Sequence, residues 1–130
     1  LLLASATAAP TSRCLMAAEA LIQQSPDFSK ASITTSHLYK RHLAQHFCEI
    51  AGNMTAVELG IYHGYTTSVL ANMFRKVIAV DVDTALIETA SSNLGRLERN
   101  VVFLCMDLMS DDWNKFDSNA VDVVVIDARR

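Results

Sequence analysis

The sequence predicts an α/β fold built on a parallel sheet, because short apolar strands alternate with segments of helical periodicity. A second observation is that each expected strand ends in or next to an acidic residue. The 130 residues, 51% hydrophobic and 19% charged, match one globular domain in length and composition. We therefore expect a single sheet with acidic side chains gathered at one edge.

Two helices are expected ahead of the first strand. Residues 12–24 carry an apolar stripe that stops at Ser25-Pro26. Residues 33–51 form the second helix, which ends before Gly52-Asn53. Its expected apolar side consists of Leu38, Leu43, Phe47 and Ile50, and its solvated side of Lys40, Arg41 and Gln45. These helices would pack against the sheet or cover the mouth of a site.

Residues 57–67, Val-Glu-Leu-Gly-Ile-Tyr-His-Gly-Tyr-Thr-Thr, indicate a strand, a tight turn and a helix start. Gly60 and Gly64 permit positive φ and leave no Cβ between the backbone and a ligand. Thr66 and Thr67 can cap the helix expected over 67–74, whose free N–H groups face the turn. Glu58 adds a carboxylate, which repels a phosphate and attracts ammonium or hydroxyl donors. The pattern favours a zwitterionic or nucleoside ligand, although a glycine pair after a strand also occurs as a plain turn.

The turn lacks the two common nucleotide-binding motifs. A dinucleotide site needs G-x-G-x-x-G, but Tyr62 stands where the second glycine belongs. A triphosphate loop needs a lysine after its last glycine, and Tyr65 follows Gly64 instead.

Three later strands are expected over 76–81, 101–107 and 121–127, and they end in Asp81, Asp107 and Asp127. A helix over 84–97, capped by Asp83 or Thr84, separates the first two, and a short loop or helix opens at 111–113. In an open parallel sheet the carboxyl ends of the strands line one crevice, where ligands bind. Each of these aspartates has the alternative role of a helix N-cap.

Residues 58–66 resemble the first motif of class I S-adenosylmethionine-dependent methyltransferases. Their spelling, E-x-G-x-x-x-G-x-[ST], is similar to that of catechol-type and caffeoyl-CoA-type O-methyltransferases. The resemblance implies a Rossmann-like three-layer sandwich, of which this chain supplies the first four strands in the order 3-2-1-4. It also implies S-adenosylmethionine as the cofactor.

The resemblance also implies roles for individual residues. Asp81 would bind the ribose hydroxyls and Asp107 would lie beside the adenine, with a capping role equally expected for Asp107. Tyr62 would lie close to the cofactor, although Tyr62 and Tyr65 could instead pack the turn against its helix. The full expected cofactor set is Glu58, Gly60, Tyr62, Gly64, Thr66, Asp81 and Asp107.

The same resemblance implies methyl transfer to a hydroxyl of a small-molecule acceptor. Asp127 is the candidate catalytic residue, because the corresponding aspartate of the metal-dependent members binds a divalent cation such as Mg²⁺. Here Ala128-Arg129-Arg130 follows, whereas the catechol-type pattern has an aromatic residue and a catalytic lysine nearby. The alternatives are a catalytically silent scaffold of the same fold and an NAD-dependent oxidoreductase.

The expected organisation is a signal-like or disordered lead-in over 1–10, N-terminal helices over 11–52, and the first part of the cofactor domain over 53–130. We expect a C-terminally truncated chain, inactive alone, with 121–126 as an exposed apolar edge. A cytoplasmic location is favoured, and residues 1–10 leave secretion or an organelle as alternatives.

The charge, the apolar runs and the cysteines of the chain indicate which partners and which redox state to expect. A net charge of −3 without a basic cluster argues against nucleic acid, and no run reaches the roughly 18 apolar residues of a membrane span. Cys14, Cys48 and Cys105 share no short spacing, so reduced thiols are expected, with Cys105 inside a buried strand. His42 and His46 stand one helical turn apart and are expected on a solvated face rather than at a metal.

Overall fold

The computed structural model describes residues 12–27, 36–110, 112–115 and 120–127, so the lead-in over 1–10 lies outside the described residues. Strands β1 (Thr55–Leu59), β2 (Lys76–Asp81), β3 (Val101–Cys105) and β4 (Val123–Ile126) form one parallel sheet in the order β3-β2-β1-β4. The predicted α/β class and the predicted strand order are both confirmed.

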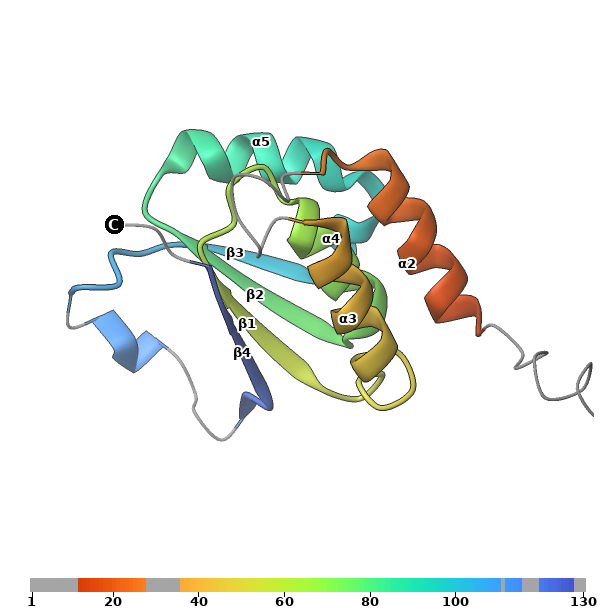
Figure 1. Cartoon of the computed structure of the whole chain (residues 1–130). Coiled ribbons are helices and arrows are strands. Elements are labelled where there is room, and N and C mark those ends of the chain that lie inside the picture. Colours follow the sequence, from red (N-terminus) through yellow and green to blue (C-terminus); the bar gives the residue numbers. More distant parts are fainter. Residues whose placement is uncertain (1–11, 28–35, 111, 116–119, 128–130) are drawn as a thin grey trace, which may run out of the picture.

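The helices gather on one side of this sheet (Figure 1). α4 (Tyr65–Met73) and α5 (Thr84–Leu94) follow β1 and β2 and pack on the sheet, and α2 (Arg13–Gln24) and α3 (His37–Phe47) contact α4. The main core lies between these helices and the side chains that the strands direct toward them, including Ala56, Val77, Ala79 and Val125. None of the described helices is long and apolar enough to cross a membrane.

The strands turn alternate side chains to opposite faces, as a pleated backbone requires. A second, smaller core lies on the face away from the α-helices, where Val57, Leu59, Val80 and Met106 are buried. Leu108 and Val121, from the segments after β3 and before β4, pack against these residues. β4 is an edge strand of the described sheet, and its Val124 and Ile126 are 53% and 65% exposed, as expected for an apolar edge.

The N-terminal helices start where serine caps are available. Ser12 Oγ accepts a hydrogen bond from the Leu15 N–H, and Ser36 Oγ accepts one from the Tyr39 N–H, each at 3.1 Å. The helix predicted over 12–24 is confirmed, but the second helix is shorter than predicted and ends at Phe47. Its apolar side was predicted correctly for Leu43 and Phe47, which pack against the core. The prediction was wrong for Leu38 and Ile50, which are exposed, and for Lys40, which is fully buried.

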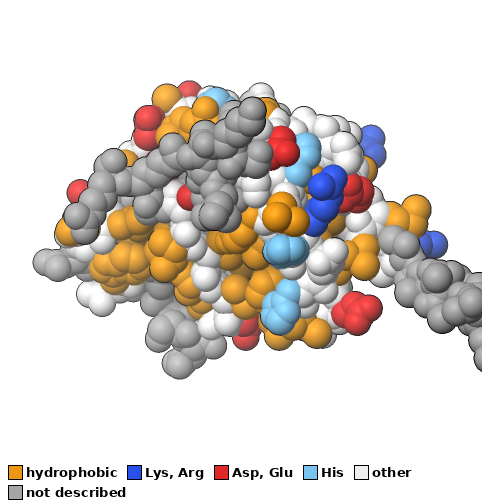
Figure 2. Space-filling view, in the orientation of Figure 1, with side chains coloured by type: hydrophobic (Ala, Val, Ile, Leu, Met, Phe, Trp, Pro, Cys, Tyr) orange, Lys and Arg blue, Asp and Glu red, His pale blue; other side chains and the backbone are white. Residues whose placement is uncertain are grey.

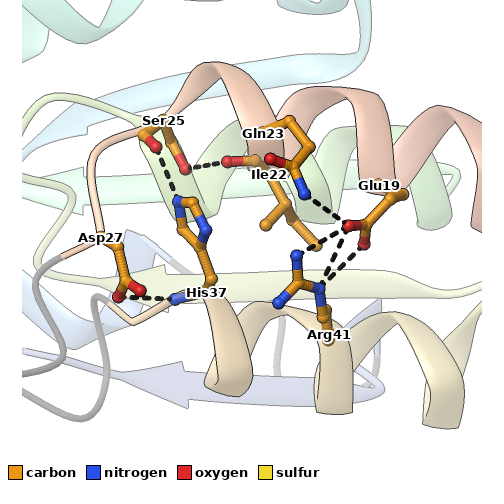
Figure 3. A network of polar contacts seen from close by, with 7 residues as sticks. All are labelled: Glu19, Ile22, Gln23, Ser25, Asp27, His37 and Arg41. Carbon is orange, nitrogen blue, oxygen red and sulfur yellow. Dashed lines mark hydrogen bonds and ion pairs between the residues drawn. The ribbon is translucent and has the colours of Figure 1, made fainter.

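The junction between α2 and α3 is polar and densely hydrogen-bonded (Figure 3). Arg41 on α3 reaches Glu19 on α2, with its shortest contact, from Nη2 to Oε1, at 2.7 Å. His37 Nε2 donates to the Ser25 carbonyl at 2.7 Å, and Ser25 Oγ donates to the Ile22 carbonyl at 2.8 Å. These contacts fix the orientation of α3 relative to α2, so that its Ser36, Lys40 and Ala44 face inward.

A disulfide between Cys14 and Cys48 joins the start of α2 to the end of α3, with 5.6 Å between the Cα atoms. The expectation of reduced thiols was therefore wrong for this pair, because the fold brings together two cysteines that are 34 residues apart. Cys105, expected to be buried, is free and exposed. Disulfides persist mainly in oxidising compartments, so the pair supports the secreted or organellar alternative over the cytoplasmic one.

Several predicted boundaries shift at their ends. α5 begins after its Asp83 cap as predicted but stops at Leu94, because Gly95 has a φ of 55° and a 3₁₀ helix follows over Gly95–Asn100. β3 ends at Cys105 and β4 at Ile126, so Asp107 and Asp127 follow their strands rather than close them. A second 3₁₀ helix, Asp112–Lys115, lies between these strands.

Candidate functional site

The turn between β1 and α4 has the backbone that its glycines were expected to permit. Gly60 and Gly64 have φ of 87° and 83°. Tyr62, between them, also has a positive φ, of 48°, although it is not a glycine. The Gly60 N–H donates to the Val80 carbonyl at 2.9 Å, which holds the turn against the end of β2. The turn is therefore a compact loop at the carboxyl edge of the sheet.

The missing Cβ of Gly64 leaves room for α5 rather than for a ligand, and the cofactor role of Gly64 stays a prediction. A Cβ at this position would lie 2.9 Å from both Ala90 Cβ and Leu94 Cδ1, on α5. Gly64 is needed for its positive φ and for the close approach of α5 to the turn. Gly60 thus lines the hollow, whereas Gly64 allows α5 to pack closely against the turn.

Thr66 and Thr67 do not cap α4, because the helix begins earlier, at Tyr65, and its N-cap is Gly64 without a side-chain bond. Thr67 Oγ1 instead donates a hydrogen bond to Glu58 Oε2 at 2.6 Å. Glu58 is only 1% exposed. Burial raises the pKa of its carboxyl to about 8, against the lowering effect of the Thr67 hydrogen bond. Near neutral pH the site thus holds an acid that is largely protonated, and a cation could ionise it.

A small, partly open hollow adjoins the turn. Its lining residues are Lys40, Glu58, Gly60, Ile61, Tyr62, Tyr65, Thr66 and Asp127. Asp127 reaches it because its N–H donates to the Leu59 carbonyl at 2.8 Å, which continues the pairing of β4 with β1. The structure therefore brings together Glu58, Gly60, Tyr62, Thr66 and Asp127, which the sequence had indicated from separate motifs.

Asp81 lies beside the hollow and is tied to the turn. Its Oδ2 accepts a hydrogen bond from the Ile61 N–H at 3.1 Å, and its Oδ1 accepts one from the Asp83 N–H at 3.0 Å. A carboxylate offers about four lone-pair sites, so it can accept further hydrogen bonds from hydroxyl groups. Asp81 is thus positioned to extend the site away from Glu58 along the carboxyl edge of the sheet.

Asp107 is exposed and does not line the hollow. Its Oδ1 accepts a hydrogen bond from the Met109 N–H at 2.9 Å, so it caps the turn after β3. This bond closes a turn and does not cap a helix, so the alternative expectation of a helix N-cap was wrong for Asp107. The adenine role of Asp107 stays a prediction.

Aromatic rings cover the outer side of the turn. The rings of Tyr62 and His63 stack with centroids 3.8 Å apart, and Tyr65 meets His63 edge-on at 6.0 Å. Tyr62 is 48% exposed while lining the hollow, so both expected roles, packing and proximity to a ligand, agree with its position.

Sequence reasoning missed the contribution of α3. Lys40, on α3, lines the hollow. The adjacent Tyr39 is partly buried, and this burial raises the pKa of its hydroxyl, with smaller contributions from Asp127 and Glu58. Leu43 and Phe47 had indicated the buried face correctly, but Lys40 was expected on the solvated side. The local signal that includes Lys40 is the spacing of four between Ser36, Lys40 and Ala44.

A divalent cation was expected at Asp127, so the arrangement of possible metal ligands bears on that role. Within the described part of the chain, no three His, Cys, Asp or Glu side chains lie close enough to hold a metal ion together. The metal role of Asp127 therefore stays a prediction. His42 and His46 are exposed, in agreement with a solvated helix face.

The comparison with protein families connects this geometry to a known domain. A family model described as a methyltransferase domain matches residues 56–128, which is more than half of the chain and includes the turn, Asp81, Asp107 and Asp127. The chain belongs to this methyltransferase domain family. The family implies S-adenosylmethionine as the cofactor, in agreement with the class I resemblance of residues 58–66. No curated protein matches the chain.

Solved structures of methyltransferases share the fold. A Pyrococcus horikoshii protein named "putative RNA methyltransferase" is 20% identical, with a TM-score of 0.63 over 92% of this chain and 59% of its own. A precorrin-6y C5,15-methyltransferase from Geobacter metallireducens is 13% identical, with a TM-score of 0.58 over 80% of this chain and 54% of its own. This chain spans little more than half the length of either protein. At 20% and 13% identity, the likeness shows a shared fold alone.

The described residues fit the amino-acid and ribose ends of such a cofactor. The ammonium of a methionine moiety needs an acceptor, which Glu58 could provide at the hollow. The ribose hydroxyls need an acceptor at the end of the second strand, which Asp81 could provide. No phosphate-binding lysine is required, in keeping with the acidic character of the turn.

Proposed function

We propose that this domain binds S-adenosylmethionine and serves methyl transfer to a hydroxyl group of a small molecule. The observation that carries the proposal is the bond from the Ile61 N–H to Asp81 Oδ2 at 3.1 Å. It joins the expected ribose-binding acid to the glycine turn, and Glu58 lines the hollow beside the same turn. One continuous edge thus offers acceptors for the amino-acid end and the ribose of one ligand.

Asp127 is the group best placed to act on the acceptor. When bound, the cofactor would supply an electrophilic methyl group. A correctly aligned acceptor oxygen would attack the methyl carbon in line while the carbon–sulfur bond breaks and the thioether leaves. The carboxylate of Asp127 lines the hollow at the end of β4, where it can take the proton of an acceptor hydroxyl. A net charge of −3 supports a small-molecule acceptor rather than a nucleic acid. A divalent cation at Asp127 would serve the same step by lowering the pKa of the hydroxyl.

The proposal is tested by the affinity for S-adenosylmethionine of an Asp81→Asn variant, measured by isothermal titration calorimetry. The amide keeps one acceptor for the backbone but removes the charge, so we expect affinity to fall about 10- to 100-fold. Asp122→Asn is the matched control, because Asp122 Oδ2 also accepts a backbone N–H, from Thr55 at 2.8 Å, at the opposite end of β1.

The same titration separates the alternatives. Unchanged affinity in Asp81→Asn, or an equal loss in Asp122→Asn, would count against the assigned site. Tight binding of reduced nicotinamide dinucleotide instead of S-adenosylmethionine would favour the oxidoreductase. Absence of any cofactor binding in the parent protein would favour the silent scaffold.

A further inference from the structure

Lys40 is a buried cation at the edge of the hollow. Its side chain is fully buried on α3, and its Nζ donates to Ser25 Oγ at 3.3 Å and lies 5.9 Å from the Tyr65 ring centroid. Burial of an ammonium is costly, and here burial lowers the pKa of Lys40. The charge of Asp27 acts in the opposite direction and raises this pKa, and an anionic ligand at the hollow would likewise stabilise the charged form of Lys40.

The hollow is lined by ionisable groups of both signs. Glu58 lies on β1 and Asp127 follows β4, whereas Lys40 comes from α3. Lys40 is the one lysine or arginine among the described residues that line the hollow. An acid that a cation can ionise, in the same hollow as an ammonium, complements a zwitterion whose ammonium binds Glu58 and whose carboxylate binds Lys40.

Several backbone N–H groups of the turn that could bind a carboxylate are already hydrogen-bonded within the protein. The Gly60 N–H donates to the Val80 carbonyl, the Ile61 N–H to Asp81 Oδ2, and the Gly64 N–H to the Ile61 carbonyl. A ligand carboxylate therefore gains little from these three backbone groups. The Lys40 ammonium is a charged donor at the same hollow.

We propose that Lys40 binds the carboxylate of the amino-acid end of the cofactor, which makes α3 part of the cofactor site. The inference rests on the proposed function and adds a residue that determines which cofactor form is bound. The polar junction of α2 with α3 then has a role in binding, because Ser25 holds the Lys40 ammonium and His37 holds the Ser25 carbonyl.

The test compares S-adenosylmethionine with its decarboxylated form, which lacks only the carboxylate, by calorimetry on the parent protein and on Lys40→Met. The parent should prefer S-adenosylmethionine about 10- to 100-fold, the range of one charge-assisted hydrogen bond. Lys40→Met should lose this preference by weakening S-adenosylmethionine while leaving the decarboxylated form nearly unchanged. Lys76→Met is the matched control, since Lys76 is exposed at the start of β2, and it should keep the parent preference.

The opposite results would overturn the inference. An equal preference in Lys40→Met and in the parent would remove Lys40 from the carboxylate site, and an equal loss for both ligands would reduce it to packing. If the parent bound neither ligand, the proposed function itself would fail. Should Lys40→Met not fold, as judged by circular dichroism, ¹⁵N-lysine spectra of the parent decide. The Lys40 Nζ resonance must shift with S-adenosylmethionine and not with the decarboxylated form.

Discussion

Glu58 shows how a single buried carboxyl can connect stability to binding. Burial raises the pKa of Glu58 from 4.5 to about 8 in the folded protein, so the folded state holds a proton that the unfolded chain releases at lower pH. Between these two pKa values the folded state binds more protons than the unfolded state. Glu58 therefore lowers the free energy of unfolding progressively as pH rises from 4.5 to about 8.

A Glu58→Gln variant should remove this pH dependence. The amide has the same shape and cannot ionise, so we expect a melting temperature near that of the parent at pH 4.5 and about 5 °C or more above it at pH 8. Thermal unfolding followed by circular dichroism across this range measures the effect. Glu88→Gln is the control, because Glu88 is exposed on α5 and should keep the parent slope. Parallel curves for Glu58→Gln and the parent would show that Glu58 ionises normally.

At the scale of elements, the strands were predictable and the burial of Lys40 on α3 was not. The buried strands are runs of β-branched residues, and their acids follow at the carboxyl ends, so the order of motifs located β1, β2 and the site edge. The face of α3 depends on partners that are distant in sequence, since Lys40 reaches Ser25 and Tyr65. A local count of apolar residues cannot contain that information.

The same limit explains the other missed features. Cys14 and Cys48 pair across 34 residues, which no short spacing could indicate. The glycine spacing located the turn correctly but could not show that the bare side of Gly64 faces Ala90 on α5. In each case the missing information was which element lies next to which, and that is decided by tertiary packing.

Loss of the Cys14–Cys48 disulfide should destabilise the arrangement of α2 and α3. Closing a loop of this separation is worth about 3 to 4 kcal/mol through the unfolded chain. A Cys14→Ser/Cys48→Ser double variant should therefore unfold at lower denaturant concentration, and dithiothreitol should shift the parent to the same midpoint. Cys105→Ser is the control, because Cys105 is free and exposed and should leave the midpoint nearly unchanged.

A thiol titration in denaturant checks the pairing directly. The unreduced protein should react as one thiol, from Cys105, and the reduced protein as three. Three reactive thiols before reduction, or a midpoint insensitive to dithiothreitol, would show that Cys14 and Cys48 are not joined.

At the scale of the whole molecule, the two faces of the sheet differ in how they are covered. The four described α-helices lie on one side (Figure 1), and hydrophobic side chains gather on the surface where the strands lie (Figure 2). Parallel sheets are usually covered on both faces. Here Val102, Val124 and Ile126 are 44%, 53% and 65% exposed on the face away from those helices. Val124 and Ile126 lie together on the edge strand β4, whereas Val102 lies on β3 at the opposite edge. Exposed apolar neighbours such as the β4 pair favour association.

A Val124→Lys variant should reduce that association. Val124 pairs with Val57 in the register of β4 with β1, and a lysine there adds charge to an exposed edge without entering the helix-covered core. We expect lower fluorescence of a bound hydrophobic dye and a smaller mass by light scattering at matched concentration. Met16→Lys is the control, because Met16 is 62% exposed on α2, away from the sheet face, and should change neither readout. Equal effects of the two substitutions would mean that added charge alone acts, whereas an effect confined to Val124 assigns the association to the sheet.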